Sequence, residues 1–246
     1  MDFNRVWNWF CKGCLILLIL IIINSILGDI LFRIKYSFPK IADTSQNIIN
    51  TQNEPVQNNL ADSNYIKAYG EKNIFALKPQ AEYSIAGLVV TKNTNFWFRD
   101  IMRSTFDDIC LMDIGIVWGE LAKDKQKLYK NWKFKSLKTL GESRRLEWCS
   151  KVTTDTMPWD LSYVSSHISH THLIPANPNI MGALLRIKKN DIVKIDGYLV
   201  DIYTDKNELV AKTSLSRTDT DPTSRGSGAC EDMYVKQVQI NNKIYR

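Results

Sequence analysis

The sequence predicts an α+β, β-rich protein, in which an N-terminal transmembrane helix precedes a small, curved, β-barrel-like (OB-like) domain with a few helices. Two observations lead there. An apolar run without charge extends from Gly13 to Gly28, and short β-branched segments separated by turn residues fill most of the second half of the 246 residues. The predicted regions are a short tail (1–13), the transmembrane helix (14–33), a linker (34–63) and a globular domain (64–246).

The apolar run approaches the roughly 20 residues that a helix needs to span the hydrocarbon core of a bilayer. A cleaved signal peptide is the alternative, with the cut after Gly28. Signal-peptide cleavage requires a small residue at the third position before the cut, where this chain has Ile26. Trp7 and Trp9 are typical of a membrane interface. These features favour a retained anchor.

Basic residues flank the run almost equally on both sides, so charge alone does not fix the orientation. A short N-terminal tail before a single span usually stays in the cytoplasm. We therefore expect the C-terminal domain to lie outside the cytoplasm.

The segment that follows the run, residues 41–63, is rich in Asn and Gln and poor in aromatic residues. Such a composition buries too little apolar surface to offset the entropy of ordering. It predicts an extended, mobile linker between membrane and domain.

In the first part of the domain, residues 82–91 and 109–118 are short, β-branched and apolar, as expected of buried strands. Between them, residues 95–104 suggest one or two helical turns. The sequence therefore predicts two strands joined by a short helix.

The clearest helix signal is Asn177 followed by Pro178, a good N-cap and a residue favoured at the first helical position. Lys188 and Lys189 are expected in the last turn, and Asn190 in the left-handed conformation that ends it. After the helix we expect a strand at 192–203 with a bend at Gly197, a hairpin partner at 208–216, a polar loop at 217–229 and a final strand at 233–240.

Several blocks together resemble a family of uncharacterised bacterial proteins: DICLMDIGIVWG (108–119), SHTHLIPANP (169–178), NDIVKIDGYLV (190–200), SLSRTDT (214–220) and GSGACEDMYV (226–235). The resemblance covers about residues 82–240 and implies a membrane-anchored protein of the bacterial inner membrane, with no activity attached. This chain departs from the family pattern at Asn190, where glycine is usual, and in an expanded loop at 221–227.

All three histidines fall within SHISHTH, as His167, His170 and His172. His170 and His172 share one face of a strand, which is the geometry that a His-x-His metal pair needs, with Cys230 or an aspartate as a further ligand. The alternative is structural: His172 hydrogen-bonds the backbone near Pro175, and the other two histidines are solvated.

A second chemical hypothesis is a cysteine nucleophile. Cys230 follows a Gly-rich loop, His172 lies about sixty residues earlier, and Arg217 or Arg225 is the candidate to stabilise an oxyanion. The motifs around Cys230 differ from those of membrane-anchored cysteine transpeptidases, since Ala229 precedes it and the acidic Glu231 follows. A buried structural cysteine is therefore favoured.

A basic segment at 123–151 combines an excess of Lys and Arg with interleaved aromatic residues, a composition typical of polyanion-binding surfaces. The candidate contact residues are Lys130, Lys133, Lys135, Lys138, Arg144 and Arg145. For an exported domain, anionic lipid or an acidic envelope polymer is a more accessible partner than nucleic acid. The alternative is a solvated loop whose aromatic residues pack into the core.

The sequence thus predicts a non-catalytic binding or structural domain, anchored in the membrane and exposed at the cell envelope, with no cofactor. Its expected partners are the membrane itself and an envelope protein or anionic polymer. A cysteine hydrolase or transpeptidase using Cys230 and His172 is one alternative, and polyanion or nucleic-acid binding through residues 123–151 is another.

Overall fold

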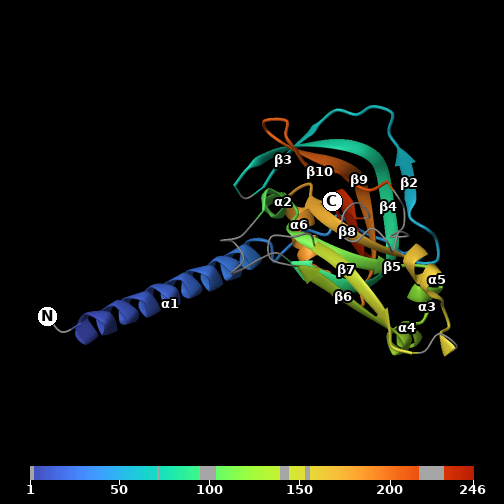
Figure 1. The fold of residues 1–246 in the computed structure, drawn as a ribbon. Helices are drawn as coiled ribbons and strands as arrows, with labels where there is room; N and C mark the ends of the chain where they lie inside the picture. Colours follow the sequence, from blue (N-terminus) through green and yellow to red (C-terminus); the bar gives the residue numbers. More distant parts are fainter. Residues whose placement is uncertain (1–2, 71, 95–103, 139–143, 153–155, 216–229) are drawn as a thin grey trace.

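The computed structural model describes residues 3–70, 72–94, 104–138, 144–152, 156–215 and 230–246. A long helix, α1 (Phe3–Lys35), projects from a β-rich body (Figure 1). Within α1, the stretch Cys11–Lys35 is long and apolar enough to cross a membrane, and none of the described side chains in its most apolar part is buried. The described chain therefore has an N-terminal apolar helix followed by a mostly β domain with a few helices, as predicted.

Five strands form the centre of the domain: β4 (Ile74–Thr94), β5 (Met112–Val117), β8 (Ile168–Pro175), β11 (Glu231–Ile240) and β9 (Ile192–Thr204). Each pairs with the next in that order, and β9 pairs with β4, so the pairings run round a closed ring. Only the β8–β11 pairing among these five is parallel. Counted along the chain, the third strand (β8) and the fifth strand (β11) are the parallel neighbours, and a helix (Pro178–Arg186) lies between the third strand and the fourth (β9). This is the connectivity of an OB fold.

The strand β4 joins the two halves of the ring because it is long and bent. Its residues 75–88 pair with β9 and residues 88–94 pair with β5. The register shifts between Pro79 and Ala81 and again between Val89 and Thr91. Bulges of this kind bend a strand and increase its twist, which lets one strand serve two neighbours.

The inner side of the ring holds the largest hydrophobic cluster, which includes Ile85, Ile114, Leu173, Ile195 and Val235. Because side chains alternate along a strand, the neighbours of these residues point outward. Two further clusters lie on the outer side. One is formed with the region between β5 and β8, and the other is formed around Phe75, Leu77 and Ile202.

The predicted helix is α6 (Pro178–Arg186), between β8 and β9, and it packs on the inner cluster through Ile180 and Leu184. The Asn177 side chain accepts from the Ile180 amide, as the N-cap prediction requires. The helix ends at Arg186, however, so Lys188 and Lys189 lie beyond its last turn, contrary to the prediction. Asn190 has the predicted left-handed conformation, with φ 76°, a region that asparagine tolerates better than most residues.

Gly197, where a bend is predicted, lies at a close approach between β9 and β11. A Cβ on Gly197 would sit 2.0 Å from the Tyr234 carbonyl oxygen. The β11 register shifts between Val235 and Gln237, directly opposite. The bulge is therefore on β11, and Gly197 provides the space for it. Beyond β9, a turn with Asn207 at φ 64° leads to β10 (Leu209–Ala211), which confirms the hairpin, although the return strand is shorter than the predicted 208–216.

Short elements surround the ring. They are β3 (Ile66–Tyr69), α2 (Thr105–Ile109), α3 (Glu120–Lys123), α4 (Lys125–Asn131), the hairpin β6 (Trp132–Lys138) and β7 (Arg144–Ser150), α5 (Leu161–Ser166) and β12 (Lys243–Tyr245). The start of the predicted strand at 109–118 is wrong, since Ser104 and Asp107 form a capping box that makes residues 105–109 helical. Most of the helical turn predicted at 95–104, and the polar loop at 217–229, lie outside the described residues.

The segment predicted to be a mobile linker is part of the domain surface. Its β1 (Asp43–Thr44) pairs with β12, and β2 (Val56–Asn59) pairs with β4. Ile49 is buried, and the Thr51 carbonyl accepts from the Gly119 amide. Composition predicted too little apolar burial, but backbone pairing to the edge of a preformed sheet needs almost none.

Candidate functional site

Three of the blocks noted in the sequence meet on the outer face of the ring. Asp113 lies on β5, His170 and His172 lie on β8, and Cys230 immediately precedes β11. Asp113 and His172 are direct cross-strand partners. The inward-facing neighbours Ile114 and Leu173 belong to the core, so the alternation of the strands turns Asp113 and both histidines outward.

His172 is held by a carboxylate. Its Nδ1 lies 2.7 Å from Asp113 Oδ1, and the two residues are 5% and 1% exposed. The Phe106 ring meets the His172 ring edge to face at 5.1 Å between centroids. An ionised carboxylate only accepts, so Nδ1 carries a proton, and in the neutral ring Nε2 then has a lone pair for a ligand.

His170 contacts the thiol of Cys230. Its Nδ1 lies 3.2 Å from Cys230 Sγ, and its ring centroid is 4.8 Å from that of His172. His170 is fully buried, whereas Cys230 is only partly buried. The thiol therefore lies at the solvent side of the pair.

Together these residues offer a metal-ligating set, since one nitrogen from each of His170 and His172 and the Cys230 sulfur lie within 4.8 Å of one another. In tetrahedral zinc sites the metal–nitrogen and metal–sulfur bonds are about 2.0 and 2.3 Å long, which places neighbouring N and S ligands about 3.5 Å apart. The observed 3.2 Å between His170 and Cys230 is close to that value. A soft or borderline transition metal fits two imidazoles and one thiolate.

The inner side of the same strands carries a separate polar chain. Ser169 Oγ donates to Glu231 Oε2 at 2.8 Å and lies 2.8 Å from Thr171 Oγ1. Because Ser169 has one hydroxyl proton, Thr171 donates to Ser169. The Glu231 carboxylate thus faces the interior, on the opposite side of the sheet from the Cys230 thiol, and it does not take part in the His–Cys cluster.

The structural alternative for the histidines is wrong in its details. His172 bonds a carboxylate instead of the backbone, and His170 is buried rather than solvated. His167 does lie apart from the cluster, stacked on Tyr163 with ring centroids 3.9 Å apart and its Nδ1 2.9 Å from the Tyr163 carbonyl oxygen. It offers a matched control for the other two.

Of the residues proposed for nucleophilic chemistry, Cys230 does lie near histidine, but its neighbour is His170 and not the predicted His172. Arg217 lies outside the described residues. No disulfide joins the five cysteines, all of which lie in the described residues; Cys110 is buried and Cys149 is exposed.

The basic segment is not a loop. It forms α3, α4 and the β6–β7 hairpin, in which Trp132 and Phe134 are buried and Lys133 and Lys135 are exposed on the opposite face. Lys130 is also exposed, at the end of α4. The backbones of Lys138, Arg144 and Arg145 lie in the hairpin, and their side chains fall outside the description. Polyanion binding here stays a prediction.

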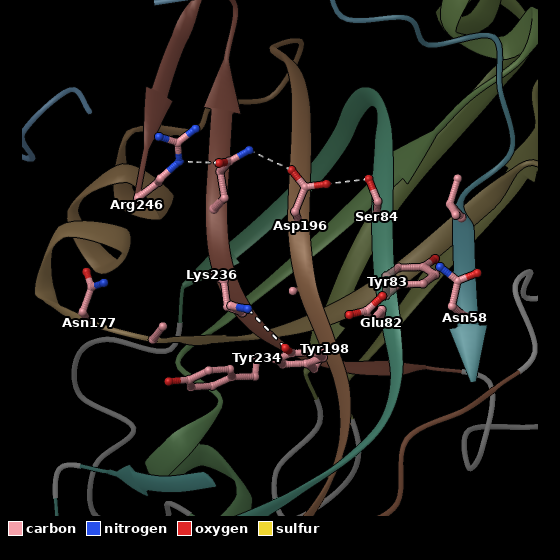
Figure 2. A pocket seen from close by; sticks show the side chains of 14 residues that line it. Asn58, Glu82, Tyr83, Ser84, Asn177, Asp196, Tyr198, Tyr234, Lys236 and Arg246 are labelled. Atoms are coloured by element: carbon pink, nitrogen blue, oxygen red, sulfur yellow. Dashed lines mark hydrogen bonds between the residues drawn. The ribbon is translucent and has the colours of Figure 1, made fainter. Parts of the chain in front are cut away.

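A cavity of about 770 Å³ lies elsewhere, against the outer faces of β4, β9 and β11 (Figure 2). A row of hydrogen bonds crosses its wall: Ser84 to Asp196 at 2.6 Å, Gln237 to Asp196 at 3.1 Å and Arg246 to Gln237 at 2.7 Å. These polar side chains bind one another across three strands. The cavity has the volume of a ligand site, but its wall contains no cluster of metal-ligating residues among the described side chains.

An aromatic patch adjoins that row. Lys236 Nζ lies 4.6 Å from the centre of the Tyr198 ring and donates to the Tyr198 hydroxyl at 3.2 Å (Figure 2). Burial raises the pKa of Tyr234, beside it. The polar groups of this patch bind one another and therefore offer less to a ligand. The His–Cys cluster remains the site with the more specific chemistry.

Comparison with known proteins does not extend this description. No family model, no curated protein and no solved structure matches the chain. Functional inference therefore rests on the residues themselves.

The sequence did not single out Asp113, which orients His172. One signal was present: Asp113 is the only charged residue in the otherwise apolar block ICLMDIGIVW. A carboxylate in a buried strand needs a partner, so its presence indicated a basic or proton-donating group on a neighbouring strand.

Proposed function

We propose that this protein is a single-span, membrane-anchored domain that binds a transition-metal ion through His170, His172 and Cys230. The observation that carries the proposal is the convergence of the three ligand atoms within 4.8 Å on one face of the β-ring. This refines the expected non-catalytic binding role by naming a class of ligand.

The Asp113–His172 pair supports this proposal. Histidine ligands of metals usually donate their second ring nitrogen to a carboxylate or carbonyl, which fixes the ring and raises its basicity. Asp113 has this relation to His172, at 2.7 Å and with both groups buried. A histidine pair packed only for stability needs no such arrangement.

The donor set limits the choice of metal. Two imidazoles and one thiolate favour zinc or copper over magnesium or calcium, which prefer oxygen ligands. Three protein ligands leave a position for water or a further group in a tetrahedral site. The partial exposure of Cys230 supports an open position on the solvent side.

We further propose that α1 anchors the protein and that the domain faces away from the cytoplasm at the bacterial inner membrane. The exposed apolar side chains of Cys11–Lys35 support the anchor, since such a surface is unfavourable in water. In cell fractionation the full chain is expected with the membranes, and a chain lacking residues 1–33 is expected in the soluble fraction. A full-length chain in the soluble fraction refutes the anchor, and a mature N-terminus at Asp29 identifies a signal peptide.

Metal content tests the main proposal. The full chain, purified in detergent, is exposed to a mixture of zinc, copper, nickel and magnesium and desalted, and bound metal is measured by mass spectrometry. We expect one zinc or copper ion per chain, retained by His167→Gln and lost in His170→Gln, His172→Gln and Cys230→Ser. Equal metal content in all four variants, or none in the wild type, refutes the site.

A cysteine nucleophile is the second candidate, favoured by the 3.2 Å contact between His170 and Cys230. Labelling by iodoacetamide separates the two functions. A metal-bound thiolate is protected until a chelator is added, whereas a nucleophile reacts faster than the exposed Cys149 with or without chelator.

A further inference from the structure

A positively charged site, separate from the proposed metal site, lies at the base of the long helix α1. A cavity of about 400 Å³ opens between the last turn of α1, the end of β4, β6 and the turn after α6. Four basic residues from these four places line it: Arg33, Lys92, Lys135 and Lys189. None of the described residues that line it is acidic. The cavity thus collects positive charge from segments far apart in the sequence.

Lys92 forms the fixed part of this site. Its Nζ donates to the carbonyl oxygens of Leu184, Leu185 and Ile187 at 3.0, 2.8 and 2.7 Å, at the end of α6. Burial, and then the charge of Arg33, lower the pKa of Lys92 to about 8, and Asp191 offsets this only in part. Positive charges are therefore crowded here beyond what the nearby acid balances, and a bound anion would relieve the repulsion.

The remaining lining suits the oxygens of a phosphate. Thr91 and Thr94, which carry hydroxyl groups, and Asn93, which carries an amide, are among the lining residues. Lys189 lies with its ammonium 4.8 Å from the centre of the Tyr129 ring, which limits its motion. Lys135 is exposed on β6. Hydroxyl, amide and ammonium donors around a cavity of this size match a phosphate group.

The location indicates where the phosphate comes from. Arg33 lies in the last turn of the proposed membrane span, beside the exposed apolar side chains of Leu31 and Ile34. If α1 crosses the bilayer, this cavity lies at the level of the headgroups, and acyl chains extend along α1. Anionic headgroups attract each nearby Lys or Arg with about 1 kcal/mol.

We propose that this cavity binds the phosphate of an anionic phospholipid headgroup. The site is distinct from the exposed lysines of the segment 123–151, of which it shares only Lys135. It is also independent of the metal site, but it rests on the proposed anchoring by α1.

The test measures co-purified lipid. The full chain is equilibrated in detergent micelles with equal amounts of phosphatidylglycerol and phosphatidylcholine, and retained lipid is quantified after a second column. We expect preferential retention of phosphatidylglycerol. The pair Arg33→Gln and Lys135→Gln should reduce it by roughly twenty-five-fold, from about fivefold for each basic residue. The control pair Lys206→Gln and Lys243→Gln, both exposed and outside the cavity and the segment 123–151, should retain it.

Equal retention of the two lipids, or an equal loss in both variant pairs, refutes the site. Displacement of the lipid by an equal concentration of inorganic phosphate assigns the cavity to a soluble phosphate and refutes the lipid source. Flotation of all variants with phosphatidylcholine vesicles measures anchoring by itself, so a failed anchor is distinguished from a failed headgroup site.

Discussion

Replacing Asp113 by Asn tests how the metal site is oriented. The amide keeps the shape of the carboxylate and can still accept from His172 Nδ1, but it removes the negative charge. In the structure this charge-assisted hydrogen bond is 2.7 Å long between two buried groups, and the Phe106 ring covers it. The substitution therefore changes the basicity of the ligand more than its position.

Substitutions in such outer partners of metal ligands typically cost about 10- to 100-fold in metal affinity. The carboxylate is nearly inaccessible to water, so little solvent screening weakens its effect, and we expect a loss toward the upper end of that range. Competition with a chelator of known affinity measures the change in dissociation constant for zinc.

The control is Asp196→Asn, which alters an aspartate on the opposite side of the ring that bonds Ser84 and Gln237. Its zinc affinity should equal that of the wild type. Thermal unfolding shows whether each variant is folded. A folded Asp113→Asn protein with unchanged affinity would refute the role given to Asp113.

Two further predictions concern the scaffold. Gly197→Ala should destabilise the domain by about 3 kcal/mol or more, because its Cβ would meet the Tyr234 carbonyl oxygen and both strands are held by pairing, and urea unfolding measures this; a loss below about 1 kcal/mol contradicts the close approach. Asp201→Asn should stabilise the protein at pH 7, since burial raises the pKa of Asp201 and the charged form is therefore disfavoured in the folded state, while its amide oxygen still accepts from Thr213. This gain should shrink as the pH falls through the raised pKa toward the unfolded value near 3.8, because the carboxyl is then neutral in both states; a gain that is the same at pH 7 and pH 3 contradicts the assignment.

The elements with a strong local signal were predictable. The Asn177–Pro178 start of α6 and the β-branched run of β9 follow from capping and strand propensity, which act within a few residues. The end of α6 was not predictable, because Lys92 from a distant strand binds the last carbonyl groups of the helix and helps to fix where it stops. The edge strands β1 and β2 were missed for the same reason, since their partners are distant in sequence.

For the candidate site, spacing alone placed His170 and His172 on one face of a strand, and Cys230 was a possible ligand. What spacing could not give is the parallel pairing of β8 with β11, which brings Cys230 to His170 across sixty residues of chain. Nor could it give the β5–β8 register that sets Asp113 opposite His172. Those facts depend on the closed order of the sheet.

X-ray absorption at the metal edge tests the central claim most directly. On the zinc-loaded full chain it should show one sulfur neighbour at about 2.3 Å and nitrogen or oxygen neighbours at about 2.0 to 2.1 Å, with four ligands in all. Cys230→Ser should remove the sulfur contribution, whereas Cys149→Ser should leave it unchanged. A six-coordinate shell of oxygen and nitrogen without sulfur would contradict a site built from His170, His172 and Cys230.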